Sequence, residues 1–149
     1  MIEYRKANIN DVQYLVGYRK QQLIDEGEIF EYKIDSELFD YFISSISDNS
    51  LISWLAVDSE KIIATSGVCF YQLPPTSRNP TGKVAYITNM YTLPEYRKQG
   101  IGSRLLQLVI AEAKAQKYKL IRLHTSADGK SIYSQAGFTD TDGFMAKRL

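Results

Sequence analysis

The sequence predicts an α/β domain in which a central mixed sheet is flanked by helices. Its 149 residues give enough chain for one hydrophobic core, and a content of 44% hydrophobic and 23% charged residues is typical of a soluble globular protein. In the second half, segments rich in β-branched and aromatic residues alternate with helical patterns, in the order strand, glycine-containing turn, helix, strand, short helix, strand. We therefore expect residues 1–149 to form a single domain.

The first half of the chain contains regular hydrophobic patterns that end at polar or turn-forming residues. A loop is expected over residues 74–82, which hold three of the four prolines of the chain. The expected elements are a strand over Ile2 to Lys6, a helix capped by Asn8 and Asp11 that runs to about Asp25, a helix from about Ser36 to Ser47, and a hairpin of Ile52 to Val57 and Lys61 to Leu73.

The second half begins with a strand over Val84 to Thr92, which has β-branched and aromatic residues and no internal Gly or Pro. An amphipathic helix follows, with apolar residues from Ile101 to Ala113 at helical spacing. Alternation over Tyr118 to Thr125 predicts another strand, and a short helix over Lys130 to Ala136 is closed by Gly137 and Phe138.

The run Arg97-Lys98-Gln99-Gly100-Ile101-Gly102 joins the long strand to the amphipathic helix, and we expect it to form the first turn of that helix. Free N–H groups and the helix dipole favour an anion at a helix start, and glycines let a ligand approach the backbone. No P-loop pattern is present. A Rossmann fingerprint fails because Leu105 stands where the third glycine is required, and no acid follows about 20 residues later.

Two separated motifs make the chain resemble the acetyl-CoA-dependent N-acetyltransferases of the GNAT superfamily. Asn89 to Ser103 is similar to the family's strand and pyrophosphate loop, with its Arg/Gln-x-x-Gly-x-Gly core, and Ile132 to Phe138 is similar to its tyrosine-bearing helix with a Gly-Phe ending. The resemblance implies that the fourth and fifth strands, Val84 to Thr92 and Lys119 to Thr125, splay apart around the thioester and pantetheine arm. The residues that it implies for binding acetyl-CoA are Met90, Tyr91, Thr92, Arg97, Lys98, Gln99, Gly100, Ile101, Gly102 and Ser103.

The resemblance also implies that Tyr133 is the general acid for the departing CoA thiolate. A tyrosine pKa of about 10 against about 8.5 for a thiol makes complete proton transfer uphill by about 2 kcal/mol. Tyr133 is therefore expected to act as a hydrogen-bond donor, or to have its pKa lowered by Lys130 or by the helix start. Asp128 stands where many relatives carry an asparagine that contacts CoA, which argues against that contact here.

Several residues are candidates for the base that deprotonates the amine. His124 ends a predicted strand, and histidine side chains titrate near neutral pH. Glu28 is the acidic candidate in the segment that walls the acceptor site in the resembled family. Water held by strand carbonyls is an alternative, and the other side chains considered are Glu26, Glu31, Tyr86 and Asn89.

Charge is sorted along the chain although the net charge is only +1. Residues 25–40 contain seven acids and one base, whereas residues 76–124 contain nine bases and two acids. The basic segment suits the phosphates of CoA. The acidic segment either lines the acceptor site and attracts a cationic amine by its negative charge, or is an ordinary solvated surface. A near-neutral total argues against nucleic acid as a partner.

The remaining composition narrows the class of protein further. With one His and one Cys, a zinc site is not expected, and Cys69 is expected to be a packing residue. No apolar run approaches membrane-spanning length and the start resembles no signal peptide, so a cytoplasmic location without a membrane partner is expected. The family often dimerises, so a homodimer is compatible with the resemblance, and the tail from Phe144 to Leu149 is a candidate strand within or between chains.

Two functions of different class remain open at this stage. The first is an enzyme that transfers acetyl from acetyl-CoA to a primary amine on a small molecule, peptide or protein, by direct attack in a ternary complex and without a metal. The alternative is a non-catalytic acyl-CoA-binding module that senses the cofactor or regulates a partner. The sequence names neither the acceptor nor the range of acyl groups.

Overall fold

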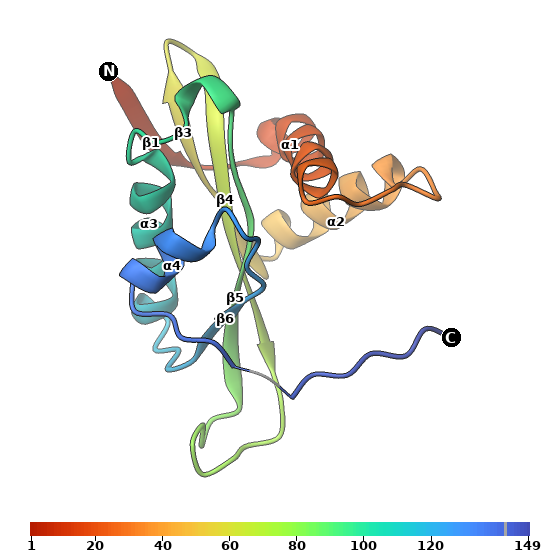
Figure 1. Ribbon diagram of the computed structural model, residues 1–149, viewed down its shortest axis with the longest axis vertical. Coiled ribbons are helices and arrows are strands. Elements are labelled where there is room, and N and C mark those ends of the chain that lie inside the picture. The colour runs from red at the N-terminus through yellow and green to blue at the C-terminus, as the bar shows by residue number, and fades with distance from the viewer. Residues whose placement is uncertain (142) are drawn as a thin grey trace.

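The computed structural model describes residues 1–141 and 143–149, and these form one mixed sheet covered by helices on both faces. Figure 1 shows α1 and α2 on one side of the sheet and α3 with the short α4 on the other. In chain order the elements are β1 (Ile2–Lys6), η1 (Ile9–Asp11), α1 (Val12–Asp25), α2 (Asp35–Ser47), β2 (Leu51–Ile52), β3 (Trp54–Asp58), β4 (Lys61–Gln72), β5 (Lys83–Thr92), η2 (Pro94–Tyr96), α3 (Ile101–Ala115), β6 (Ile121–Leu123) and α4 (Lys130–Gln135). The predicted fold class, an α/β sheet with helices on both faces, is confirmed.

The strands are ordered β1-β3-β4-β5-β6, and β2 pairs with β4 beside this path. All pairs are antiparallel except β5 with β6, which is parallel. Strand β4 is buried over seven consecutive residues, from Ile62 to Val68, because both of its faces are covered. One core packs Leu15 and Phe42 of α1 and α2 on the sheet, and Leu106 and Val109 of α3 lie in a core on the opposite face.

The expected cap of Asn8 and Asp11 is present, but it caps the short 3-10 turn η1, which leads directly into α1. The Asn8 side chain accepts from the backbone N–H of Asn10, and Asp11 accepts from the backbone N–H of Asn8 at 2.8 Å. Arg5 of β1 donates two hydrogen bonds to the Asp11 carboxylate, at 2.8 and 2.9 Å. The Arg5 guanidinium holds the pKa of Asp11 below its ordinary value. This pair ties the first strand to the first helix.

Strand β5 loses its neighbour halfway along. Its pairing with β6 covers only three residue pairs, Ala85 to Ile87 with Ile121 to Leu123, so the edge of β5 beyond Ile87 has no strand partner on that side in the described structure. A bulge at Asn89, whose φ is +57°, interrupts the pairing with β4 at the same level. Thr65 of β4 donates to the carbonyl oxygen of Asn89 at 2.8 Å and holds the bulge. The expected splay of the two strands is confirmed.

Several element boundaries differ from the sequence expectations. The strand expected from Tyr118 to Thr125 is only Ile121–Leu123, because the turn that closes α3 after Ala115 still engages Tyr118, whose N–H donates to the carbonyl of Ala113. The hairpin strand begins at Trp54 rather than Ile52, since β2 pairs separately with β4. The tail from Phe144 to Leu149 forms no strand in the structure as described.

Candidate active site

The turn before α3 is a loop rather than the first turn of the helix, which corrects the sequence expectation. Helix α3 begins at Ile101, and Gly100 is its N-cap with a left-handed φ of +80°. Lys98 is also left-handed, with a φ of +60°. The first helical hydrogen bond runs from Arg104 to the carbonyl of Gly100, so the N–H groups of Gly102 and Ser103 have no helical acceptor. These amides, at the positive end of a 15-residue helix, fit a diphosphate.

Arg97 does not extend freely beside this loop. Its Nε donates to the carbonyl of Thr92 at 2.9 Å and its Nη2 donates to Asp25 of α1 at 3.1 Å. Its guanidinium also lies over the ring of Tyr91, 5.5 Å from the centroid. The hydrogen bonds from Gln21 and then Arg97 lower the pKa of Asp25. For Lys98, the other cation of the loop, the described residues provide no such ion pair.

The strand residues expected to bind acetyl-CoA face opposite sides of the sheet. Met90 packs against the cores on the α3 side. Tyr91 points to α1 and lies against Tyr18, with ring centroids 5.4 Å apart. The backbone edge of β5 beyond Ile87, which has no strand partner in the described structure, fits an extended amide-containing arm.

A polar cavity of about 210 Å³ lies between α1, β5, β6 and α4. It brings together two of the three catalytic candidates, Tyr133 of α4 and His124, the residue that follows β6. The other residues that line it are Arg19, Gln22 and Glu26 of α1 and Tyr86, Ile87, Thr88 and Met90 of β5. Sequence reasoning missed Arg19 and Gln22, although the spacing of 19, 22 and 26 places three polar side chains on one helix face.

Tyr133 is held in the wall of this cavity by its neighbours. Its ring packs edge-on against Phe138, with centroids 6.0 Å apart, and a Cβ added at Gly129 would lie 2.9 Å from its Cε2 atom. Burial, followed by the charge of Glu26, raises the pKa of Tyr133 to about 12. The expectation that Lys130 lowers this pKa is wrong, because Lys130 forms an ion pair with Asp140 at 3.1 Å.

His124 meets Tyr86 inside the cavity. Its Nδ1 atom lies 2.5 Å from the Tyr86 hydroxyl, so the two side chains share one hydrogen bond across the β5–β6 pair. Burial raises the pKa of Tyr86, which keeps its proton at neutral pH. The direction of this hydrogen bond depends on the imidazole tautomer: an unprotonated Nδ1 accepts from the hydroxyl, and a protonated Nδ1 donates to it.

The acidic candidates separate into one inside the cavity and two outside it. Glu26 lines the cavity, whereas Glu28 and Glu31 are exposed and do not line it. Asn89 is also outside: it is only 4% exposed, and its Nδ2 atom finds no partner among the described residues. Glu26 is the C-cap of α1, whereas Glu28 follows the left-handed Gly27, where the chain has turned out of the helix.

Asp128 and Cys69, the other residues singled out in the sequence, do not line the polar cavity. Asp128 is exposed in the turn before α4. Cys69 packs against the core under α1 and α2, and burial raises the pKa of its thiol, as expected for a packing residue. Within residues 1–141 and 143–149, no three His, Cys, Asp or Glu side chains gather as metal ligands. No helix in the same residues has the length and hydrophobicity to cross a bilayer.

Comparison with known proteins agrees with this geometry. A family model described as the acetyltransferase (GNAT) family matches residues 20–138. A predicted acetyltransferase from Clostridium acetobutylicum, solved with acetyl-CoA, is 42% identical, with a TM-score of 0.95 over 100% of this chain and 97% of the other. A GCN5-related N-acetyltransferase from Ralstonia eutropha is 24% identical, with a TM-score of 0.93 over 100% and 99%.

A more distant structure, glucosamine-6-phosphate N-acetyltransferase from Arabidopsis thaliana, shares the fold at 19% identity, with a TM-score of 0.76 over 100% of this chain and 99% of the other. A search of functionally curated proteins found no match.

Proposed function

Since the chain belongs to the GNAT acetyltransferase family, we propose that it is an N-acetyltransferase that passes the acetyl group of acetyl-CoA to a primary amine by direct attack in a ternary complex. The observation that carries the proposal is the polar cavity at the point where β5 and β6 separate. It places Tyr133 beside the unpaired edge of β5, and this edge leads to the start of α3, where backbone N–H groups have no helical acceptor. Acetyl-CoA and the amine would meet there from opposite sides of the gap between β5 and β6.

The donor is proposed to lie along β5 with its diphosphate on the loop before α3. Gly100 gives the loop its left-handed turn, and the N–H groups of Gly102 and Ser103 would bind the phosphate oxygens. Lys98, Gln99 and Ile101 complete the loop, and Lys98 would contribute a positive charge to the diphosphate. Backbone groups of Met90 to Thr92 would bind the amides of the extended arm and stabilise the oxyanion that forms when the amine attacks. When bound, acetyl-CoA supplies an activated thioester.

The acceptor is proposed to enter from the α1 side of the cavity. An alkylammonium with a pKa of about 10.4 must lose a proton before it attacks. Glu26 and the His124–Tyr86 pair are the groups that face this space, so they replace Glu28 as the preferred acceptors of that proton. Glu26 would also attract the ammonium form.

Tyr133 is proposed to donate a hydrogen bond to the leaving sulfur without giving up its proton. With a pKa of about 12, its hydroxyl stays protonated throughout the neutral range. A short hydrogen bond to a thiolate is a charge-assisted interaction that strengthens as the sulfur gains charge. Stabilisation of this kind acts on the departing group and accelerates its release.

An acceptor screen on the purified protein tests the proposal. Acetyl-CoA is incubated with a panel of small amines, peptides and proteins; thiol release is followed, and the products are identified by mass spectrometry. We expect an acetylated primary amine with equimolar thiol release, and much less product from Tyr133→Phe. Tight CoA binding with no product on any amine would contradict the enzyme and favour a regulatory acyl-CoA-binding module. Replacing acetyl-CoA with longer acyl-CoA donors in the same assay tests the acyl range.

A further inference from the structure

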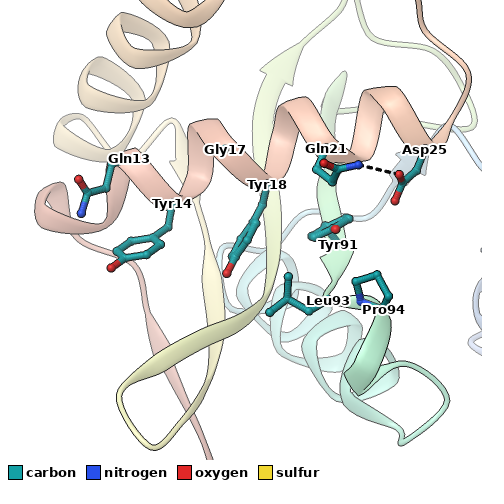
Figure 2. A pocket seen from close by; sticks show the side chains of 9 residues that line it. All are labelled: Gln13, Tyr14, Gly17, Tyr18, Gln21, Asp25, Tyr91, Leu93 and Pro94. Atoms are coloured by element: carbon teal, nitrogen blue, oxygen red, sulfur yellow. Dashed lines mark hydrogen bonds between the residues drawn. The ribbon is translucent and has the colours of Figure 1, made fainter.

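A second cavity, of about 490 Å³, lies on the other side of α1, where the helix crosses the end of β5. It shares no lining residue with the cavity that holds Tyr133 and His124. Figure 2 shows side chains from α1 and from the end of β5 around this space, above Leu93 and Pro94. We propose that this cavity binds a small alkylammonium ion at a site separate from the reaction.

Three tyrosines form the walls of the cavity. Tyr14 and Tyr18 lie four residues apart on one face of α1, and Tyr91 comes from β5. Tyr18 and Tyr91 are 5.4 Å apart between centroids with a tilt of 30°, and Tyr14 is 44% exposed, so the aromatic wall reaches the surface. Aromatic faces attract alkylammonium and guanidinium groups through the ring quadrupole.

The charge of the cavity also favours a cation. Asp25 is the one charged residue among the nine that line it, and its carboxylate accepts a hydrogen bond from Gln21 at 2.9 Å. At this end the chain already places a cation of its own, because Arg97 lies over Tyr91 and bonds Asp25. The exposed ring of Tyr14, about three turns of α1 away from Asp25, adds an aromatic face to the cavity that Arg97 does not cover. The cavity therefore matches a small organic cation rather than an anion or a metal ion.

Gly17 makes room for such a ligand. It lies in the middle of α1, where glycine weakens a helix relative to alanine, and it lines the cavity between Tyr14 and Tyr18. A Cβ added at Gly17 would meet no atom within 4 Å. Packing therefore does not require a glycine here, and the missing side chain leaves space beside the rings.

The two cavities share helix α1. Its residues Arg19, Gln22 and Glu26 face the cavity with Tyr133, while Tyr14, Tyr18 and Asp25 face the second one. A cation bound to the second cavity would contact the helix that lines the proposed acceptor site. This inference goes beyond the proposed function, because binding at the second cavity can be measured without acetyl-CoA and without turnover.

The test compares choline with 3,3-dimethylbutan-1-ol, which has the same shape without the charge. Each is titrated into the unliganded protein while backbone amide resonances are followed by NMR. We expect choline to bind at least about tenfold more tightly than the neutral alcohol, with shifts at Tyr14, Gly17 and Tyr91. Equal binding of the two compounds, or choline shifts confined to Tyr86 and His124, would overturn the proposal.

Two pairs of variants localise the binding. Gly17→Leu fills the cavity and is expected to weaken choline at least about tenfold, whereas Gly17→Ala, with a similar gain in helix propensity, keeps most of it. Both should keep or raise the thermal midpoint, which separates lost binding from lost folding. Tyr14→Leu should weaken choline several-fold, and Tyr32→Leu, at an exposed tyrosine outside the cavity, should not. Unchanged choline affinity in Gly17→Leu would also overturn the proposal.

Discussion

Removing the hydroxyl of Tyr133 measures how the leaving thiolate is stabilised. The pKa of Tyr133 is about 12, against about 8.5 for an alkyl thiol. Complete proton transfer from the tyrosine to the sulfur is therefore uphill by a pKa difference of about 3.5, or about 5 kcal/mol. A hydrogen bond to a charged group contributes about 1.5–3 kcal/mol. Because a hydrogen bond to the sulfur avoids the free-energy cost of complete proton transfer, we expect Tyr133 to act as a hydrogen-bond donor that keeps its proton.

The variant Tyr133→Phe keeps the ring packing on Phe138 and removes only that donor. The loss of about 1.5–3 kcal/mol corresponds to a kcat lower by about 10- to 150-fold, with little change in KM for acetyl-CoA. The assay is thiol release with the best amine from the acceptor screen, repeated in the presence of saturating donor. Circular dichroism and the thermal midpoint serve as folding controls.

The pH profile separates a donor from an acid that loses its proton. A hydroxyl with a pKa of about 12 does not titrate between about pH 7 and pH 10, so Tyr133→Phe should lower kcat by a constant factor over that range. A kcat equal to that of the wild type would refute the role. A descending limb near pH 9 that disappears in the variant would refute the reasoning from the raised pKa.

Three further substitutions test other parts of the structure. Gly129→Ala places a Cβ 2.9 Å from the Tyr133 ring, so kcat should fall about tenfold while the thermal midpoint changes little; unchanged kcat would contradict this packing. Gly82→Ala, at a φ of +68°, places a Cβ 1.9 Å from the Leu73 carbonyl oxygen, and urea unfolding should show a loss of about 3 kcal/mol or more, whereas a neutral effect would contradict the loop geometry. Asp11→Ala removes the cap and the ion pair and should cost about 2 kcal/mol at pH 7. Since the pKa of Asp11 is lowered in the folded protein, the carboxylate stabilises the fold above its ordinary pKa, and this stabilisation is lost as pH falls through the folded pKa. The difference in unfolding free energy between Asp11→Ala and wild type should therefore shrink below about pH 4. A difference that persists there would contradict the role of the carboxylate.

The parts of the fold that depend on local patterns could be predicted from the sequence. The cap at Asn8 and Asp11, the helical spacing of α3 and the turn-forming Gly100 each depend on residues within one turn of chain. The two motifs around Gly100 and Tyr133 also predict a donor site between β5 and α4. These predictions needed no knowledge of long-range packing.

Features set by distant contacts could not be read in the same way. The bulge at Asn89 depends on Thr65 of the neighbouring strand, and the short length of β6 depends on how far α3 continues. Arg97 looked like a phosphate ligand because its charge is visible in the sequence, but its partner Asp25 is 72 residues away. The raised pKa of Tyr133 follows from burial, which no single residue type reveals.

The cavity residues on α1 show the same limit. Polar positions 19, 22 and 26 form one face of the helix, but the sequence does not show whether that face meets solvent or the sheet. At the level of sequence, Glu28 is the acidic candidate and Glu26 stands only among the other side chains, and the position of the two residues at the end of the helix separates them. A spacing rule applied to α1 would have favoured Glu26 together with Arg19 and Gln22.

The short pairing between β5 and β6 has a consequence for how stability is distributed along the chain. Three residue pairs, the Tyr86–His124 hydrogen bond and part of one core join residues 121–138 to the rest of the sheet, so we expect this segment to open at a lower free energy than the β3-β4-β5 centre. Its amides should exchange with deuterium before those of the buried strands. A ligand that fills the gap would add the hydrogen bonds that the strand edge lacks, and its binding energy would appear as slower exchange in the segment that carries Tyr133.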